Sequence, residues 1–150
     1  MPGPHADEAA WGELPLLIDT SAWARAGDSA VRDQWLSALL GDRLRISPLV
    51  RLEILFSARG GDGFDRLAEQ LNTIRPAPLT TAVLRAAEAG MRVLAHRSAG
   101  TQRLPIVDYL VAAAAQELGA AVIHYDSDYD RLAEVMEFES VWLAPAGSLP

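Results

Sequence analysis

Apolar residues along the chain follow two patterns, short continuous runs and longer stretches in which an apolar residue recurs every three or four positions. Continuous apolar runs bounded by polar residues are typical of buried strands, and the three-to-four spacing is typical of helices. The runs predict strands at residues 14–18, 120–124 and 140–143, and two less apolar segments, 43–47 and 72–77, are further strand candidates. The periodic stretches predict helices at residues 28–41, 48–58, 64–71, 80–94 and 106–118, with a short helix inside 126–137.

The alternation of strands and helices predicts a mostly parallel sheet with helices on both faces, which is a single α/β/α sandwich. Residues 1–13 carry neither a basic run nor an apolar core, so we expect a flexible tail there rather than a signal peptide, followed by one domain over 14–150. No stretch approaches the roughly 20 apolar residues that cross a membrane. We therefore expect a cytoplasmic protein without a membrane partner.

The composition removes several kinds of chemistry. All 13 basic residues are Arg, and the chain has no Cys. Schiff bases, a phosphate-binding Lys, disulfides and thiolate metal sites are therefore excluded. Three widely separated His disfavour an all-His metal site. Any catalysis must rest on carboxylates, although a net charge of −7 argues weakly against a nucleic-acid partner.

Two acids follow predicted strands directly. Asp19 comes after the strand at 14–18, and Asp126 comes just after the strand at 120–124. Because functional groups in open α/β sheets gather beyond the carboxyl ends of the strands, we expect both side chains at one edge of the sheet. Each residue also suits a structural role, Asp19 as a helix cap and Asp126 as the start of a turn.

Three further acids are candidates. Helical spacing places Glu53 within an apolar stripe of the helix at 48–58, where a buried carboxylate needs a metal ion or an Arg partner. Asp108 lies in the first turn of its helix, a position that favours an acid in any case. Asp128 is two residues after Asp126, so both carboxylates can reach a common point, whereas Asp130 is expected to be solvated.

Carboxylate oxygens are hard ligands that suit Mg²⁺ or Mn²⁺, and crowded acids need such a cation to neutralise them. A divalent cation can activate water and stabilise the charge that develops on a phosphate. The acids therefore fit metal-assisted hydrolysis of a phosphodiester. Once they are assigned to one site, the rest of the chain is close to neutral, which weakens the charge argument against nucleic acid.

The ordered set of motifs resembles the PIN-domain ribonucleases, and more closely the VapC toxins of type II toxin–antitoxin modules. The resemblance rests on the apolar strand that runs into Asp19, on the helical Glu53, on Asp108 in PIVDYLVAAAAQELGA, and on VIHYDSDYDRLA. It covers residues 14–143. It implies an α/β/α nuclease that binds one or two Mg²⁺ or Mn²⁺ ions and cleaves RNA. The implied catalytic acids are Asp19, Glu53, Asp108 and Asp126, and the implied metal ligands are Asp19, Asp108, Asp126 and Asp128.

The resemblance also implies partners and supporting residues. It implies a homodimer that a small cognate antitoxin holds inactive. Ser21 matches a small polar position whose hydroxyl would orient Asp19 or a water on the metal, although a helix cap explains it equally well. His124 stands where many members have Thr, and could hydrogen-bond the site or be purely structural. Arg103 is a candidate phosphate contact, with an exposed, solvated Arg as the alternative.

Two other functions are consistent with parts of the sequence. A phosphatase of the HAD type also places an acid after its first strand, but it requires a second Asp where this chain has Ser21, and it uses a Lys that this chain lacks. A PIN-like fold could also serve as a non-catalytic binding module. The presence of all five acids favours the nuclease.

Overall fold

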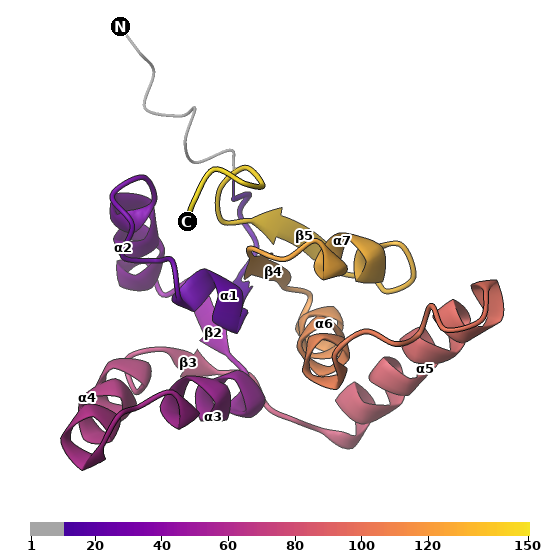
Figure 1. The fold of residues 1–150 in the computed structure, drawn as a ribbon, viewed down its shortest axis with the longest axis horizontal. Helices are drawn as coiled ribbons and strands as arrows, with labels where there is room; N and C mark the ends of the chain where they lie inside the picture. The colour runs from indigo at the N-terminus through magenta and orange to yellow at the C-terminus, as the bar shows by residue number, and fades with distance from the viewer. Residues whose placement is uncertain (1–10) are drawn as a thin grey trace, which may run out of the picture.

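The central sheet contains five parallel strands in the order β3-β2-β1-β4-β5. The computed structural model of the chain describes residues 11–150 (Figure 1). Within them the strands are β1 (Leu16–Ile18), β2 (Leu44–Ile46), β3 (Arg75–Pro76), β4 (Ala121–His124) and β5 (Glu139–Trp142). In the register, Ile18 of β1 pairs with Ile123 of β4, so both strands end at the same edge. The predicted parallel α/β/α sandwich is confirmed.

Seven helices connect the strands in the described part of the chain. They are α1 (Thr20–Trp23), α2 (Arg32–Leu40), α3 (Pro48–Phe56), α4 (Gly61–Leu71), α5 (Thr81–Arg97), α6 (Ile106–Leu118) and α7 (Asp128–Ala133). In Figure 1, α5 and α6 lie to the right of the strands and α2 lies to the left, so helices lie on both sides of the sheet. The predicted α6 is reproduced to the residue. By contrast, β3 has two residues, because Pro76 cannot donate to the strand ladder.

Helix α6 is the central helix, and it contacts α3, α5, α7 and β4. Its buried face consists largely of small side chains, Ala112–Ala115, which let it approach its neighbours closely. The helix ends at Gly119, whose φ of 64° is a left-handed conformation that glycine adopts without strain. Its first turn carries Asp108 to the edge where β1 and β4 end.

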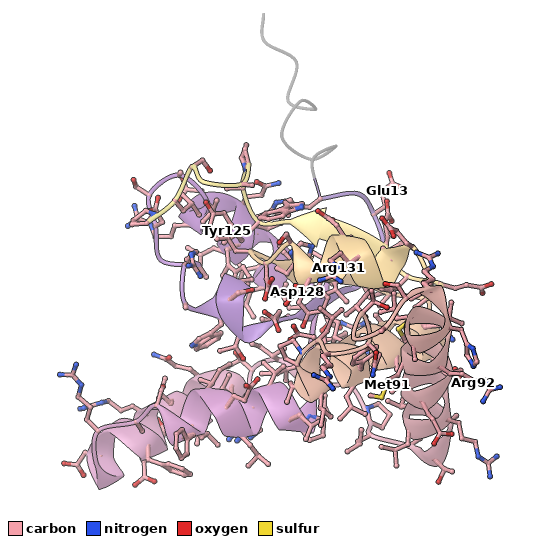
Figure 2. The ribbon with its side chains drawn as sticks, turned by 45° about the vertical axis from the view of Figure 1, so that its right-hand side comes forward. Glu13, Met91, Arg92, Tyr125, Asp128 and Arg131 are labelled. Atoms are coloured by element: carbon pink, nitrogen blue, oxygen red, sulfur yellow. The ribbon has the colours of Figure 1, made fainter. Side chains whose placement is uncertain are left out.

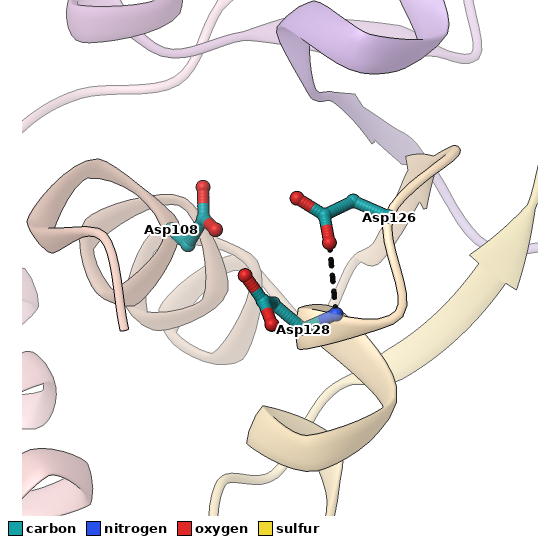
Figure 3. Close-up of side chains that lie close together, drawn as sticks. All are labelled: Asp108, Asp126 and Asp128. Carbon is teal, nitrogen blue, oxygen red and sulfur yellow. Dashed lines mark hydrogen bonds between the residues drawn. The ribbon is translucent and has the colours of Figure 1, made fainter. Parts of the chain in front are cut away.

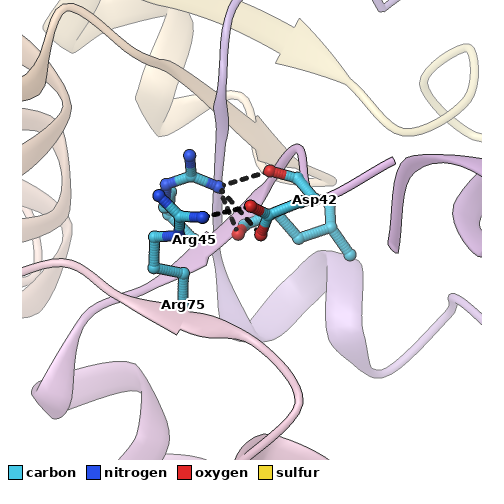
Figure 4. Close-up of polar contacts among 4 residues, drawn as sticks. Asp42, Arg45 and Arg75 are labelled. Carbon is cyan, nitrogen blue, oxygen red and sulfur yellow. Dashed lines mark hydrogen bonds and ion pairs between the residues drawn. The ribbon is translucent and has the colours of Figure 1, made fainter. Parts of the chain in front are cut away.

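The turn from α2 to β2 carries Asp42, whose side chain connects this turn to the neighbouring strand β3. Asp42 has a φ of 56°, which Asp tolerates better than most residues. Its backbone carbonyl accepts a 2.7 Å hydrogen bond from Arg45, and its carboxylate pairs with Arg75 (Figure 4). The side chains of Asp42 and Arg75 are largely exposed, so the pairing between them adds little stability. It does connect the start of β2 with β3.

The chain before β1 is anchored to the domain from Trp11 onward. The Trp11 side chain is buried, and its indole nitrogen donates to the carbonyl of Leu143 at 3.2 Å. Arg43 donates to the carbonyl of Gly12 at 2.9 Å. Residues 11–13 therefore belong to the domain rather than to the predicted tail, whose residues 1–10 lie outside the described part. Between residues 11 and 150, no helix is both long and apolar enough to cross a membrane.

Candidate metal centre

Asp19 lies between β1 and α1, and every oxygen of its carboxylate accepts a hydrogen bond. Oδ2 accepts from the backbone N–H of Ser21 at 3.0 Å and from the Ser21 hydroxyl, which makes Asp19 the cap of α1. Oδ1 accepts from the hydroxyl of Tyr129 at 2.6 Å. The Ser21 hydroxyl in turn accepts from the backbone N–H of Tyr125 at 2.9 Å. Asp19 is thus both a helix cap and an acid held rigidly at the end of β1.

Three other acids meet at the same edge of the sheet. Asp108 comes from the first turn of α6, Asp126 from the loop after β4, and Asp128 from the start of α7 (Figure 3). Each offers one carboxylate oxygen such that the three oxygens lie within 4.8 Å of one another. The turn is tightened by a 3.0 Å hydrogen bond from the backbone N–H of Asp128 to Oδ1 of Asp126. We call Asp108, Asp126 and Asp128 the acid trio.

Asp108 has the strongest need for a cation. Its side chain is 8% exposed, and its Oδ2 has no hydrogen-bond partner among the described residues. Burial, as the largest cause, and the charges of Asp19 and Asp126 together raise the pKa of Asp108 to about 7, against a smaller lowering by the Tyr129 hydrogen bond. A buried carboxylate oxygen without a partner is costly unless a cation meets it. The acid trio therefore fits a hard divalent ion such as Mg²⁺ or Mn²⁺.

Asp128 is less buried and has a positive neighbour. Burial and the nearby Asp126 raise the pKa of Asp128, while the guanidinium of Arg131 opposes that rise. Figure 2 labels Asp128 and Arg131 close together on α7. Crowding at the acid trio is thus only partly compensated by the protein itself, which again favours a bound cation.

Tyr129 is a site residue that the sequence analysis missed. Its fully buried hydroxyl lies between two acids, 2.6 Å from Asp19 Oδ1 and 3.3 Å from Asp108 Oδ1. An aromatic residue at this point of α7 is expected in the core on periodicity alone, so the only available signal was its hydroxyl, which needs a partner when it is buried. Tyr129 links Asp19 to the acid trio.

Glu53 lies outside the acid trio, and its predicted burial is wrong. The helix α3 buries Val50, Ile54 and Leu55, so the apolar stripe that contains Glu53 faces outward, with Phe56 91% exposed. Helical periodicity identified one apolar stripe on α3. The helix has a second apolar side, however, and it is this second side that packs against the core. Glu53 is exposed and accepts a 3.0 Å hydrogen bond from the Thr20 hydroxyl, next to Asp19. No ion pair joins it to an Arg among the described residues.

Three residues near the site have different surroundings. His124 is completely buried, and burial lowers its pKa to about 4, so the ring is neutral. Asp130 is exposed, but it accepts hydrogen bonds from Ser140 and Trp142 and is not simply solvated as the sequence predicts. Arg103 is exposed in the loop that leads into α6. Its phosphate-binding role stays a prediction.

Removal of the Tyr129 hydroxyl tests how the acids are coupled. Because its hydrogen bond lowers the pKa of Asp108, we expect Tyr129→Phe to raise that pKa and to strengthen competition by protons for the cation. The expected result is about tenfold weaker Mn²⁺ binding at pH 7, measured by calorimetric titration. Tyr109→Phe is the matched control, since its buried hydroxyl donates to the backbone of Gln102. Equal Mn²⁺ affinity in the two variants would contradict the coupling.

Comparisons with known proteins show the family of this chain. The sequence profile of the PIN domain matches residues 16–135. Ribonuclease VapC18 of Mycobacterium tuberculosis is 38% identical over 137 residues, which cover 91% of this chain and 100% of that protein. Ribonuclease VapC51 of the same species is 33% identical, with 91% and 98% covered.

Solved structures support the fold. A DNA-bound VapBC from Salmonella typhimurium superposes with a TM-score of 0.68 at 16% identity, covering 88% of this chain and 100% of that one. VapBC-5 from Mycobacterium tuberculosis gives a TM-score of 0.62 at 20% identity, with 85% and 98% covered. At such identities these two structures bear on the fold alone.

Proposed function

The chain belongs to the PIN-domain family, and we propose that it is a metal-dependent endoribonuclease that acts as the toxin of a type II toxin–antitoxin module. The observation that carries the proposal is the acid trio, in which the buried Oδ2 of Asp108 has no hydrogen-bond partner within residues 11–150. The ribonuclease names of its relatives support RNA as the substrate. An RNA substrate in turn supports a cytoplasmic location.

We assign roles to the acids from their surroundings. Asp108, Asp126 and Asp128 hold Mg²⁺ or Mn²⁺, which when bound supplies the positive charge that activates water and stabilises the charge on the phosphate. Asp19, fixed by Ser21 and Tyr129, adds a fourth negative charge beside the trio.

The residues around the acids have supporting roles. Ser21 orients Asp19 through its hydroxyl, whereas the alternative role of helix cap falls to Asp19 itself. Glu53 lies at the edge of the metal site, where it accepts a hydrogen bond from Thr20, and it is not a metal ligand. Arg103, exposed before α6, contacts RNA phosphate, for which a guanidinium is well suited.

A cognate antitoxin and a second copy of the chain are the proposed protein partners. Structural neighbours are VapBC complexes, two of them bound to DNA. An antitoxin segment with an Arg would neutralise the same acids that a metal ion needs. Masking of these acids explains how such a partner could hold the nuclease inactive.

The two alternative functions are less well supported. A phosphatase of the HAD type needs an acid at position 21, where Ser21 instead donates its hydroxyl to Asp19. It also needs a Lys, and the chain has none. A non-catalytic module has no need for three convergent carboxylates, one of which has a buried oxygen without a partner in the described part of the chain.

The substrate class is tested with the purified chain freed of any antitoxin. With Mn²⁺ present, we expect it to cleave total RNA internally and to leave a small phosphomonoester intact. Expression without the antitoxin should arrest growth. Hydrolysis of the phosphomonoester in place of RNA would support the phosphatase, and failure to cleave either substrate would support the binding module.

A further inference from the structure

The group that faces Nδ1 identifies the tautomer of the His124 ring. The backbone N–H of Asp126 points at Nδ1 at 3.1 Å. A backbone N–H can only donate a hydrogen bond, so Nδ1 must be the unprotonated acceptor. The proton of this neutral ring therefore lies on Nε2.

A chain of hydrogen bonds continues from Nε2 to the surface. Nε2 lies 2.7 Å from the hydroxyl of Ser140 on β5, and that hydroxyl donates to Oδ1 of Asp130 at 2.7 Å. The Ser140 hydroxyl has one hydrogen, which it donates to the Asp130 carboxylate in a hydrogen bond. The Ser140 oxygen must therefore accept the hydrogen bond from His124. The indole N–H of Trp142 occupies the other oxygen of Asp130 at 2.9 Å. The direction of every hydrogen bond between Asp130 and the backbone of Asp126 is therefore fixed.

Packing against aromatic neighbours fixes the position of the His124 ring, but it does not determine which ring nitrogen carries the proton. The His124 ring stacks on Tyr129 with centroids 4.9 Å apart and meets Trp142 edge-on at 5.0 Å. If the proton moved to Nδ1, two N–H groups would face each other, and the loop that carries Asp126 would have to shift. Asp128 would be affected as well, because its N–H donates to Asp126.

We propose that Asp130, Ser140 and His124 are positioning residues that hold the Asp126 loop in its metal-binding geometry, with Asp130 and Ser140 acting through the ring tautomer of His124. This inference rests on the proposed function, because it assigns Asp126 to the metal site. It gives an exposed acid outside the trio a defined effect on the trio. It also explains why a fully buried His precedes Asp126 by two residues.

The test compares Ser140→Ala with Ser140→Thr, which keeps the hydroxyl on β5. Long-range ¹H–¹⁵N spectra of the metal-free protein report the ring tautomer, and calorimetry reports Mn²⁺ affinity. We expect the wild type to show only the Nε2–H form. Ser140→Ala should lose that single form, bind Mn²⁺ about tenfold more weakly and lower kcat on RNA with KM unchanged. Ser140→Thr should restore all three.

Controls separate this inference from a loss of folding or of the proposed function. Ser148→Ala removes an exposed hydroxyl that donates to a backbone carbonyl, and should match the wild type. Asp130→Ala changes no residue of β5, although Trp142 loses an acceptor. It frees the Ser140 hydroxyl, so it should shift the tautomer in the same direction even if Ser140→Ala fails to fold. Wild-type tautomer and Mn²⁺ affinity in both variants would overturn the inference. A wild type that neither binds Mn²⁺ nor cuts RNA refutes the proposed function, while the tautomer still tests the hydrogen-bond chain.

Discussion

Asp126→Asn should abolish RNA cleavage while leaving the fold intact. The substituted amide keeps an oxygen that can accept from the Asp128 N–H, so the turn is preserved, but the charge that binds the cation is lost. We expect a fall in Mn²⁺-dependent cleavage of about 10³-fold or more. Asp19→Asn should have a comparable effect, because an amide cannot accept from Ser21 and Tyr129 at both of its atoms. Growth arrest on expression should be relieved in both variants.

An exposed acid outside the site provides the control. Asp65 lies exposed on α4, and Asp65→Asn removes the same charge without touching the trio, so cleavage should stay at the wild-type rate. Circular dichroism and thermal melting check that all three variants fold. Wild-type cleavage in both Asp19→Asn and Asp126→Asn would refute the assignment of the site.

Asp108→Asn should remove metal binding and, without metal, make the protein more stable at pH 8. The pKa of Asp108 is about 7 in the folded protein, against an ordinary value of 3.8 for an Asp side chain. The folded state therefore binds more protons between these values, and the stability of the metal-free wild type falls as pH rises from about 4 to 7. The loss is on the order of 2–4 kcal/mol. Asp108→Asn lacks this charge, and we expect a net gain of about 1–2 kcal/mol at pH 8 after the cost of a buried amide.

Urea unfolding in the presence of a chelator, at pH 5 and at pH 8, measures this effect. The wild type should lose stability between the two pH values, and Asp108→Asn should lose much less. Added Mn²⁺ should stabilise the wild type at pH 8, because it binds the folded state alone, and should leave the variant unchanged. A variant that is less stable than the metal-free wild type at pH 8 would contradict the inference that Asp108 is charged and unpaired there.

Much of the fold could be predicted because its signals are local. The apolar run before Asp19 and the uninterrupted periodicity of α6 define their elements without reference to the rest of the chain. Helix α4 begins earlier than expected, at Gly61, because a sequence-based prediction discounts glycine as a weak helix former. Asp19 and Asp126 could be placed at one edge because parallel strands end together. Asp108, which follows no strand, joined them only through the resemblance to the PIN-domain ribonucleases.

The parts of the site that escaped prediction depend on tertiary contacts. Glu53 lies on a helix that is apolar on more than one side, and periodicity does not say which side meets the core. Tyr129 reaches Asp19 across 110 positions of the chain, and His124 reaches Ser140 on another strand. Such hydrogen bonds leave no spacing pattern in a single sequence. They decide which oxygens of the acids are free to bind a cation.

Parallel titration of Mn²⁺ binding and RNA cleavage on one preparation of the wild-type chain tests the central claim most directly. If the acid trio holds the cation that the reaction needs, calorimetric binding and cleavage rate should saturate over the same Mn²⁺ concentrations, and a chelator should abolish both. Full cleavage in excess chelator, without bound ion, would contradict the account.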